Sequence, residues 1–356
     1  MAAVAIAVSF FVIIVAVAVT SGFRHTIRQG VAAMTGDIRI APLVSGGSEP
    51  VSMPRHIPGE EDILALPGVK EIVPAVVRAG IVKNGDIVHG VIVKGTERAD
   101  SALSVSIPRR LGEITGLGVG DDLTVYFVGE KVRVRKFHIS EVHRDLLELD
   151  DNLLVYADIE DLQRLNGWSS DEVSCLDILT GEADPAPLSL AVGTLAEDYY
   201  VSSSQQTYPQ VFEWLNLLDF NVLIILILMT AVAGFNMVSG LLIMLLRNIS
   251  TIGTLKTLGM DNRAVGRLFV RIGAEAVLKG MLVGNALALL FCLIQGTTHL
   301  IPLDPENYFV SWVPVHINLL WILAADAAAF LGILALLWLP SLMVAGIDPA
   351  KTVKAD

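Results

Sequence analysis

The chain is poor in cysteine, in charge and in aromatic residues. It has 2 cysteines, Cys175 and Cys292, among 356 residues. Two are too few for a disulfide framework or a cysteine-rich metal site. Charged residues make up 17% and aromatic residues 6% of the chain, and the mean hydropathy is +0.61. Soluble domains carry roughly 25% charged residues, so part of this chain is expected to lie in a membrane.

The sequence motifs of nucleotide binding and hydrolysis are missing as well. G-x-x-x-x-G-K-[ST] does not occur, and neither do H-E-x-x-H, G-x-S-x-G or G-x-G-x-x-G. The chain is therefore predicted to be a non-catalytic subunit that binds no cofactor itself. A net charge of −12 excludes a surface built for nucleic acid.

Four uncharged or sparsely charged stretches are long enough to cross a bilayer as helices, which takes about 20 residues. They are residues 2–21, 220–246, 272–295 and 317–340. The first could instead be a cleaved signal peptide ending near Ala18, but no basic residue precedes it, which favours a membrane helix. Apolar residues continue at helical spacing to about residue 35, which predicts a stalk beyond the membrane.

The charges indicate an orientation. All of the net charge lies in residues 23–215, which hold 29 acidic and 17 basic residues. The loop 247–271 carries 5 basic residues and 1 acidic residue, whereas 296–316 has no Lys or Arg. The positive-inside rule places 247–271 and the tail 341–356 in the cytoplasm. The block 36–215 and the loop 296–316 are then expected outside.

Residues 36–215 have the pattern of a mixed α/β domain. Asn84-Gly85 predicts a type I′ hairpin between two β-rich runs. A second hairpin is expected from 123–128 and 132–142. Asp158 and Gly167 are suited to cap a short helix between them. The acidic residues between 141 and 151 lack the spacing of a calcium loop and are interpreted as a solvated surface.

Polar residues inside the apolar stretches are candidate functional residues. Glu275 and Lys279 are suited to pair along one helix. Asp326 is expected either to relay force or protons or line a polar cavity, or to bond to a neighbouring helix. Asn236 and Ser239 are expected to bond between helices. Gly280, Gly284 and Ala288 form a small-residue stripe, either for packing within one bundle or for a second subunit.

Three motifs lie in and after the second apolar stretch: Phe235-Asn236-Met237-Val238-Ser239, Ile252-Gly253-Thr254-Leu255-Lys256-Thr257-Leu258-Gly259-Met260 and Ile347-Asp348-Pro349. They resemble motifs of the FtsX-like and MacB-type ABC permeases, in particular the lipoprotein-releasing (LolC/LolE-type) branch. The resemblance implies an α-helical membrane protein with four transmembrane helices and a MacB-like periplasmic core domain between the first and second. Family members begin with a cytoplasmic segment before the first span, so a truncated N-terminus is expected.

The resemblance also implies partners and sites. The partners would be a cytoplasmic ATPase dimer carrying ATP and Mg, a second permease copy or paralogue, a periplasmic carrier and lipoprotein substrates, at the inner membrane of a Gram-negative bacterium. The ATPase-coupling residues would be Ile252, Leu255, Lys256, Leu258, Gly259, Met260, Arg263 and Arg267. The wall of a lipid cavity would be Phe23, Ile27, Val31, Val222, Leu223 and Leu226. The alternatives are a MacB-like efflux or mechanotransmission permease, an FtsX-like regulator of cell-wall hydrolases, and a membrane sensor without an ATPase.

Overall fold

The computed structural model describes residues 2–44, 50–97, 102–129, 131–143, 153–181 and 183–345. The chain divides into two compact units. We call Met1–His25, Trp214–Pro302 and Trp312–Asp356 the helical unit, and Thr26–Glu213 with Leu303–Ser311 the sheet unit. The two are described separately below.

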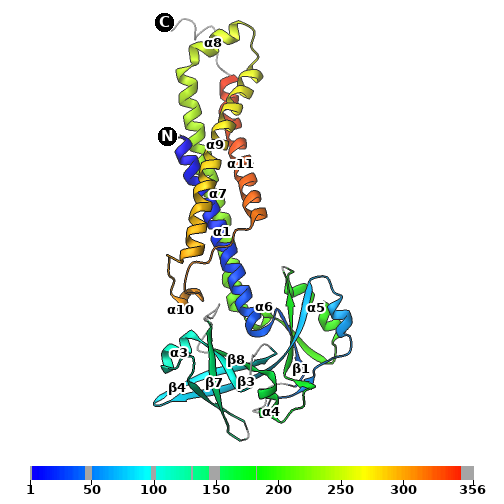
Figure 1. Ribbon diagram of the computed structural model, residues 1–356. Coiled ribbons are helices and arrows are strands. Elements are labelled where there is room, and N and C mark those ends of the chain that lie inside the picture. The colour runs from blue at the N-terminus through cyan, green and yellow to red at the C-terminus, as the bar shows by residue number, and fades with distance from the viewer. Residues whose placement is uncertain are drawn as a thin grey trace. The chain divides into compact units, whose positions relative to one another are not determined.

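Helices build the helical unit (Figure 1). They are the first part of α1 (Ala2–Thr35), most of α7 (Pro209–Arg247), α8 (Ile249–Thr257), α9 (Asn262–Thr298) and α11 (Leu319–Ala345). Among the described residues, four helices are long and apolar enough to cross a membrane. These candidate spans are Ala3–Thr35, Pro209–Arg247, Ala264–Thr298 and Leu319–Trp338. The expectation of four apolar helices is therefore confirmed.

Three of these helices are much longer than a membrane requires. α1 has 34 residues, α7 has 39 and α9 has 37. At about 1.5 Å per residue each exceeds a hydrocarbon core of about 30 Å. Of the three, α1 and α7 have residues in both units: α1 ends in the sheet unit at Thr35, and α7 begins there at Pro209.

Strands form most of the sheet unit. They are β1 (Ile38–Pro42), β2 (Met53–Pro54), β3 (Val69–Asn84), β4 (Ile87–Thr96), β5 (Ser104–Pro108), β6 (Asp122–Phe127), β7 (Arg133–His143), β8 (Leu153–Asp158), β9 (Glu172–Val173), β10 (Cys175–Thr180) and β11 (Tyr199–Ser203). Nine of them form one sheet in the order β11-β1-β10-β3-β4-β8-β5-β7-β6, and β2 pairs with β9.

The long strand β3 takes part in two arrangements. Its first half pairs with β10, and its second half pairs with both β4 and β6. Since β6 is also the last strand of the sheet order, its pairing with β3 closes β3, β4, β8, β5, β7 and β6 into a ring. The open part, β10, β1 and β11, extends from the other half of β3 and holds the strand that follows α1.

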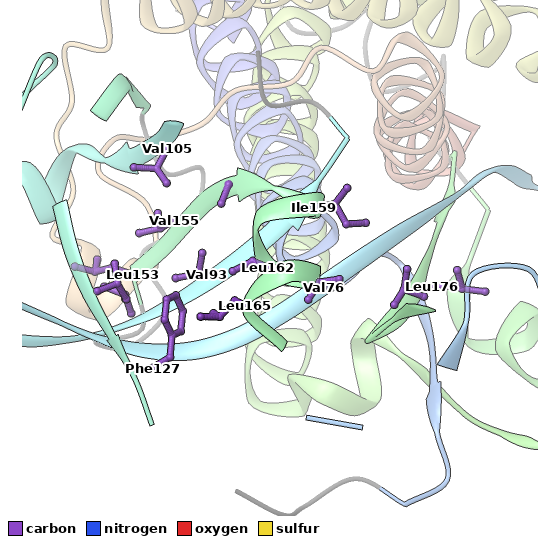
Figure 2. Packing of buried hydrophobic residues seen from close by; sticks show 14 of the residues in the cluster. Val76, Val93, Val105, Phe127, Leu153, Val155, Ile159, Leu162, Leu165 and Leu176 are labelled. Carbon is purple, nitrogen blue, oxygen red and sulfur yellow. The ribbon is translucent and has the colours of Figure 1, made fainter. Parts of the chain in front are cut away.

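Short helices accompany the strands: α2 (Glu60–Leu64), α3 (Arg109–Thr115), α4 (Ile159–Asn166), α5 (Pro185–Leu195), α6 (Ser204–Thr207) and α10 (Pro305–Tyr308). Figure 2 shows Leu162 and Leu165 of α4 gathered with Val93 and Phe127 of the strands. All four side chains are at most 1% exposed. Burial of apolar area of this kind is the main source of folding free energy.

The predicted hairpins and helix caps can be compared with the observed ones. β3 and β4 form the first predicted hairpin, and β6 and β7 form the second. The first turn is wrong by one residue, because Asn84 pairs with Ile87 and the loop is Gly85-Asp86. Gly85 has a positive φ of 59° and Asp86 does not, which fits a type II′ rather than a type I′ turn.

Asn84 remains in the strand while its side-chain amide donates to the Thr115 carbonyl at 2.8 Å. The predicted cap of α4 is confirmed, since Asp158 accepts from the Glu160 amide and Gly167 is left-handed. Of the acidic residues near 141–151, those after 143 lie outside the described residues.

Candidate functional site

Two glycines of α9 lie directly against α1. A Cβ added at Gly280 would lie 2.6 Å from Cγ2 of Ile6, and one added at Gly284 would collide with the carbonyl oxygen of Ala7. Ala288, the third member of the stripe, is fully buried. The small residues thus let two helices of one chain approach closely. This supports packing within one bundle rather than a stripe left open for a second subunit.

The predicted cavity wall on α1 is not open in this chain. Phe23 is 6% exposed, and Ile27 and Val31 are fully buried. The Phe23 ring packs edge-on against Trp214 of α7 at 5.4 Å between centroids. In the single chain these three side chains are therefore covered, and their place in a cavity wall stays a prediction.

The predicted wall on α7 is more open. Leu223 is 52% exposed, whereas Val222 and Leu226 are partly buried against the helical core. Exposed apolar side chains continue along this helix at Phe220, Ile224, Ile227, Leu228 and Phe235. Large apolar surfaces of this kind are covered by lipid or by another subunit. Of the two parts of the predicted wall, only the part on α7 presents an exposed apolar surface in the single chain.

The predicted coupling segment contains α8, a turn and the start of α9. Ile252 is 5% exposed and belongs to the helical core, so its side chain is not available to a partner. Leu258 is 80% exposed and Arg267 is also exposed. Gly259 makes the turn with a φ of 96°, and Met260 packs partly on the core. The side chains of Leu255, Lys256 and Arg263 lie outside the described residues.

Two polar side chains, Asn285 of α9 and Asp326 of α11, form a hydrogen bond between these two apolar helices. The Asn285 amide donates to Oδ2 of Asp326 at 2.5 Å, and Asp326 is 7% exposed. Of the expected roles for Asp326, bonding to a neighbouring helix is what the structure shows. Asn285 was missed because a single amide in an apolar run has no sequence partner to mark it.

The other polar residues of the apolar stretches behave differently. Lys279 and Glu275 form the expected pair at 2.8 Å, with both side chains exposed. The amide of Asn236 donates to the Val232 carbonyl of its own helix at 3.0 Å, so the predicted bond between helices is wrong there. Ser239 is exposed. Short polar side chains in apolar helices commonly bond to the carbonyl four residues before.

Metal-ligand side chains do not gather in the described part of the chain, where no group of three His, Cys, Asp or Glu suited to a metal occurs. Cys175 and Cys292 are both buried and unpaired. Burial, together with the neighbouring Asp177, raises the pKa of the Cys175 thiol to about 12. This thiol is therefore unreactive at neutral pH.

Five charged side chains of the sheet unit form a cluster that the sequence did not reveal. We call Arg28, Asp37, Arg39, Lys94 and Asp177 the charged joint; they surround the C-terminal end of α1. Asp37, Lys94 and Asp177 are at most 5% exposed. Burial alone would raise the pKa of Asp177, but the charges of Arg39 and Lys94 outweigh it and hold this pKa below its ordinary value.

Comparisons with known proteins agree with the helical architecture. Residues 223–349 match the family described as FtsX-like permease C-terminal. Over 396 aligned positions the chain is 24% identical to the lipoprotein-releasing system transmembrane protein LolE of Haemophilus influenzae, covering 99% of this chain and 93% of that protein. It is 23% identical over 398 positions to LolC of Xylella fastidiosa, covering 99% and 92%.

Two solved structures resemble the chain weakly. The periplasmic region of MacB from Actinobacillus actinomycetemcomitans matches with a TM-score of 0.31 and 14% identity, over 52% of this chain and 95% of that one. The extracellular domain of the transporter YknZ from Gram-positive bacteria matches with a TM-score of 0.29 and 14% identity, over 47% and 100%. The resemblance expected from the motifs is confirmed by the family match and the full-length similarity: residues 223–349 match the FtsX-like permease C-terminal family, and nearly the whole chain is similar to the LolE and LolC transmembrane proteins.

Proposed function

We propose that this chain is the permease subunit of an ABC transporter that extracts lipoproteins from the outer leaflet of the inner membrane and passes them to a periplasmic carrier. The observation that carries the proposal is similarity to lipoprotein-releasing LolE over 99% of the chain, sheet unit included. A family shared only through the four helices would leave the substrate class open.

The proposed topology follows from charge. The basic loop 247–271 faces the cytoplasm, and residues 36–215, between the first and second spans, form the periplasmic domain. The chain itself is non-catalytic in this scheme. A cytoplasmic ATPase dimer binds ATP and Mg, and a second permease, identical or paralogous, completes the transporter in the inner membrane of a Gram-negative bacterium.

The ATPase docks on the turn between α8 and α9 in this proposal. Leu258 supplies the apolar contact, because it is a large apolar side chain that is 80% exposed at this turn. Arg267 is an exposed cation on the same segment, one turn into α9. Lys256 and Arg263 add positive charge on either side of Leu258. Ile252 supports the turn from inside the helical core.

The lipid-binding surface in this proposal is the exposed apolar face of α7 around Leu223. Phe23, Ile27 and Val31 would join the wall only if α1 moved away from the side chains that cover it. A hydrocarbon chain gains about 0.8 kcal/mol for each CH₂ kept from water, so three acyl chains would cost on the order of 25 kcal/mol or more to expose. A shielded transfer to a carrier therefore suits this cargo.

The direct test is reconstitution of the purified transporter in liposomes that contain a lipoprotein. ATP should release the lipoprotein only when a periplasmic carrier is added. Photo-crosslinkers at Leu223 should capture lipoprotein, and crosslinkers at the buried Ile333 of α11 provide the matched control. Capture of an outer-membrane channel or of a cell-wall hydrolase, without lipoprotein release, would favour the efflux or regulator alternative instead.

A further inference from the structure

The C-terminal end of α1 is held by cations from two strands. Lys94 on β4 donates to the carbonyls of Ala33 and Met34 at 2.9 and 3.2 Å. Arg39 on β1 donates to the Met34 carbonyl at 3.1 Å. The last carbonyls of a helix have no partner within it and carry partial negative charge. Cations from the sheet satisfy them here, so the end of α1 is bonded directly to β1 and β4.

The same two cations bind one buried carboxylate. Arg39 donates to both oxygens of Asp177, at 2.7 and 3.0 Å, and Lys94 lies 2.7 Å from Oδ2. Arg39 and Asp177 are directly opposite on β1 and β10. A bidentate arginine pair fixes orientation as well as distance. The end of the helix and three strands thus share one set of charge-assisted bonds.

A second set of bonds holds α1 about two turns earlier. Arg28 donates to Asp37 at 3.2 Å, to the Thr180 hydroxyl at 2.9 Å and to the Ala183 carbonyl. Asp37 in turn accepts from the Thr180 amide at 2.8 Å. A helix bonded only at its tip can pivot about that tip. The bonds of Arg28 prevent such pivoting, because they hold α1 at a second point. Each of the two sets includes a bond to β10 or to the loop after it.

The residue that follows α1 lies close against β10. Gly36 ends α1 with a left-handed φ of 68°, and a Cβ there would lie 2.9 Å from Cβ of Asp177. The backbone therefore turns directly onto the carboxylate side of β10. A buried ionic cluster is weak evidence for stability, because apolar replacements are often as stable. Its directional bonds are better explained by a need for one fixed geometry.

We infer that the charged joint fixes the C-terminal part of α1, from Thr26 onward, to the sheet as one rigid body, so that a displacement of this part of the helix is delivered undiminished to the sheet unit. Arg28, Arg39, Lys94 and Asp177 are then positioning residues for the proposed transport cycle, on which this inference rests. α1 is one continuous helix from its apolar span to the joint, which makes it the mechanical link.

The rigidity can be measured without assuming any function. Nitroxide labels at Gln29 on α1 and Lys83 on β3, both exposed, report the helix-to-sheet distance by pulsed electron paramagnetic resonance in the full chain. The native thiols are buried and stay in place. The wild-type distribution should be narrow, and Lys94→Met with Asp177→Asn should widen it about twofold. Arg109→Met, which removes an exposed pair with Glu113, should leave it unchanged.

If the Lys94→Met, Asp177→Asn protein does not fold, Arg28→Met takes its place. This change removes the second set of bonds, and the Arg28 side chain is 23% exposed, so its loss disturbs the core less. It should widen the same distribution to a smaller extent. A wild-type distribution as broad as that of the variants, or variants as narrow as the wild type, would overturn the rigid joint.

The functional readout is the number of ATP molecules consumed per lipoprotein released by the reconstituted transporter. Loss of the joint should raise this ratio about tenfold, whereas a merely structural defect would lower ATP hydrolysis and release in proportion. An unchanged ratio with efficient release refutes the joint as a transmitter. A wild-type complex with a narrow distance distribution that releases no lipoprotein refutes the proposed function and leaves the joint standing.

Discussion

The side-chain amide of Asn285 on α9 donates a 2.5 Å hydrogen bond to the carboxyl group of Asp326 on α11. The remaining oxygen of each side chain, Oδ1 of Asn285 and Oδ1 of Asp326, is buried and has no hydrogen-bond partner. The pair is thus half satisfied: it has two free acceptors and lacks a donor. Buried polar atoms without a partner destabilise a protein by about 1–3 kcal/mol.

Asp326→Asn should therefore be neutral or stabilising. The new amide can donate to Oδ1 of Asn285 while its oxygen keeps the existing bond, which supplies the missing donor. Asn285→Leu should instead cost about 1–3 kcal/mol, because it leaves Asp326 buried without any partner. Thermal unfolding of the purified protein in detergent or nanodiscs compares the two variants.

Equal losses of stability in both variants would contradict this account of the pair. Release activity of Asp326→Asn answers a separate question. If the variant folds as well as the wild type but releases no lipoprotein, the carboxyl group has a role that hydrogen bonding between helices does not explain.

Close packing of α1 on α9 predicts a strong effect at one glycine and none at another. Gly284→Val should destabilise the helical unit by about 1–3 kcal/mol or more, because its Cβ would collide with the Ala7 carbonyl and the Phe10 side chain. Gly296→Ala on the same helix is the control, since nothing lies within 4 Å of its Cβ position. It should be neutral or stabilising by up to about 1 kcal/mol through helix propensity.

Melting temperatures of the two glycine variants in the same detergent provide the measurement. A Gly284→Val protein that melts with the wild type would show that α1 and α9 are farther apart than the structure places them.

Two substitutions in the predicted coupling segment should have different effects, one on ATPase binding and the other on folding stability. Leu258→Asp should weaken ATPase binding at least about tenfold, equivalent to about 1.4 kcal/mol, and leave the melting temperature unchanged, because Leu258 is 80% exposed. Ile252→Asp should lower the melting temperature, since it places a charge among buried helices. Affinity of the detergent-purified permease for the ATPase, measured beside its melting curve, separates the two effects.

ATPase binding that is unaffected by Leu258→Asp would show that the ATPase does not dock at this turn. Full ATPase affinity in a folded Leu258→Asp protein would be enough to reject Leu258 as a contact. Lys256→Glu combined with Leu258→Asp extends the same test to the basic character of the segment.

Local patterns predicted most of the elements and few of the contacts between them. The apolar lengths gave the four helices, and Asp158 and Gly167 gave both ends of α4, because these signals act within a few residues. The hairpin turn was shifted by one residue, since a contact from Asn84 to distant Thr115 kept Asn84 in the strand. Such contacts have no local sequence signal.

The candidate sites show the same limit. Helical spacing places Phe23, Ile27 and Val31 on one face of α1. It does not reveal that these side chains are buried in the folded chain. Ile252 and Leu258 look alike in sequence, and only the tertiary fold makes one a core residue and the other a surface residue. Arg28, Lys94 and Asp177 are up to about 150 residues apart, so their cluster is visible only in the structure.

The lowered pKa of Asp177 predicts how the charged joint responds to acid. Burial opposes the charged form, but Arg39 and Lys94 favour it more strongly, so the folded pKa lies below the unfolded value of about 3.9. A carboxyl with a depressed folded pKa stabilises the fold above its unfolded pKa and loses that contribution as pH falls through the folded pKa. Wild type should therefore be more stable than Asp177→Asn at neutral pH, with the difference shrinking below about pH 4.

Denaturant unfolding of the full chain at a series of pH values, followed by a probe in the sheet unit, measures this difference. Asp122→Asn is the matched control. A hydrogen bond from Lys136 lowers the pKa of Asp122 too, but its side chain is 48% exposed, so its variant should lose little stability at any pH. A wild-type advantage over Asp177→Asn that stays constant from neutral pH down to about pH 3 would mean that Asp177 acts through its shape and hydrogen bonds rather than through its charge.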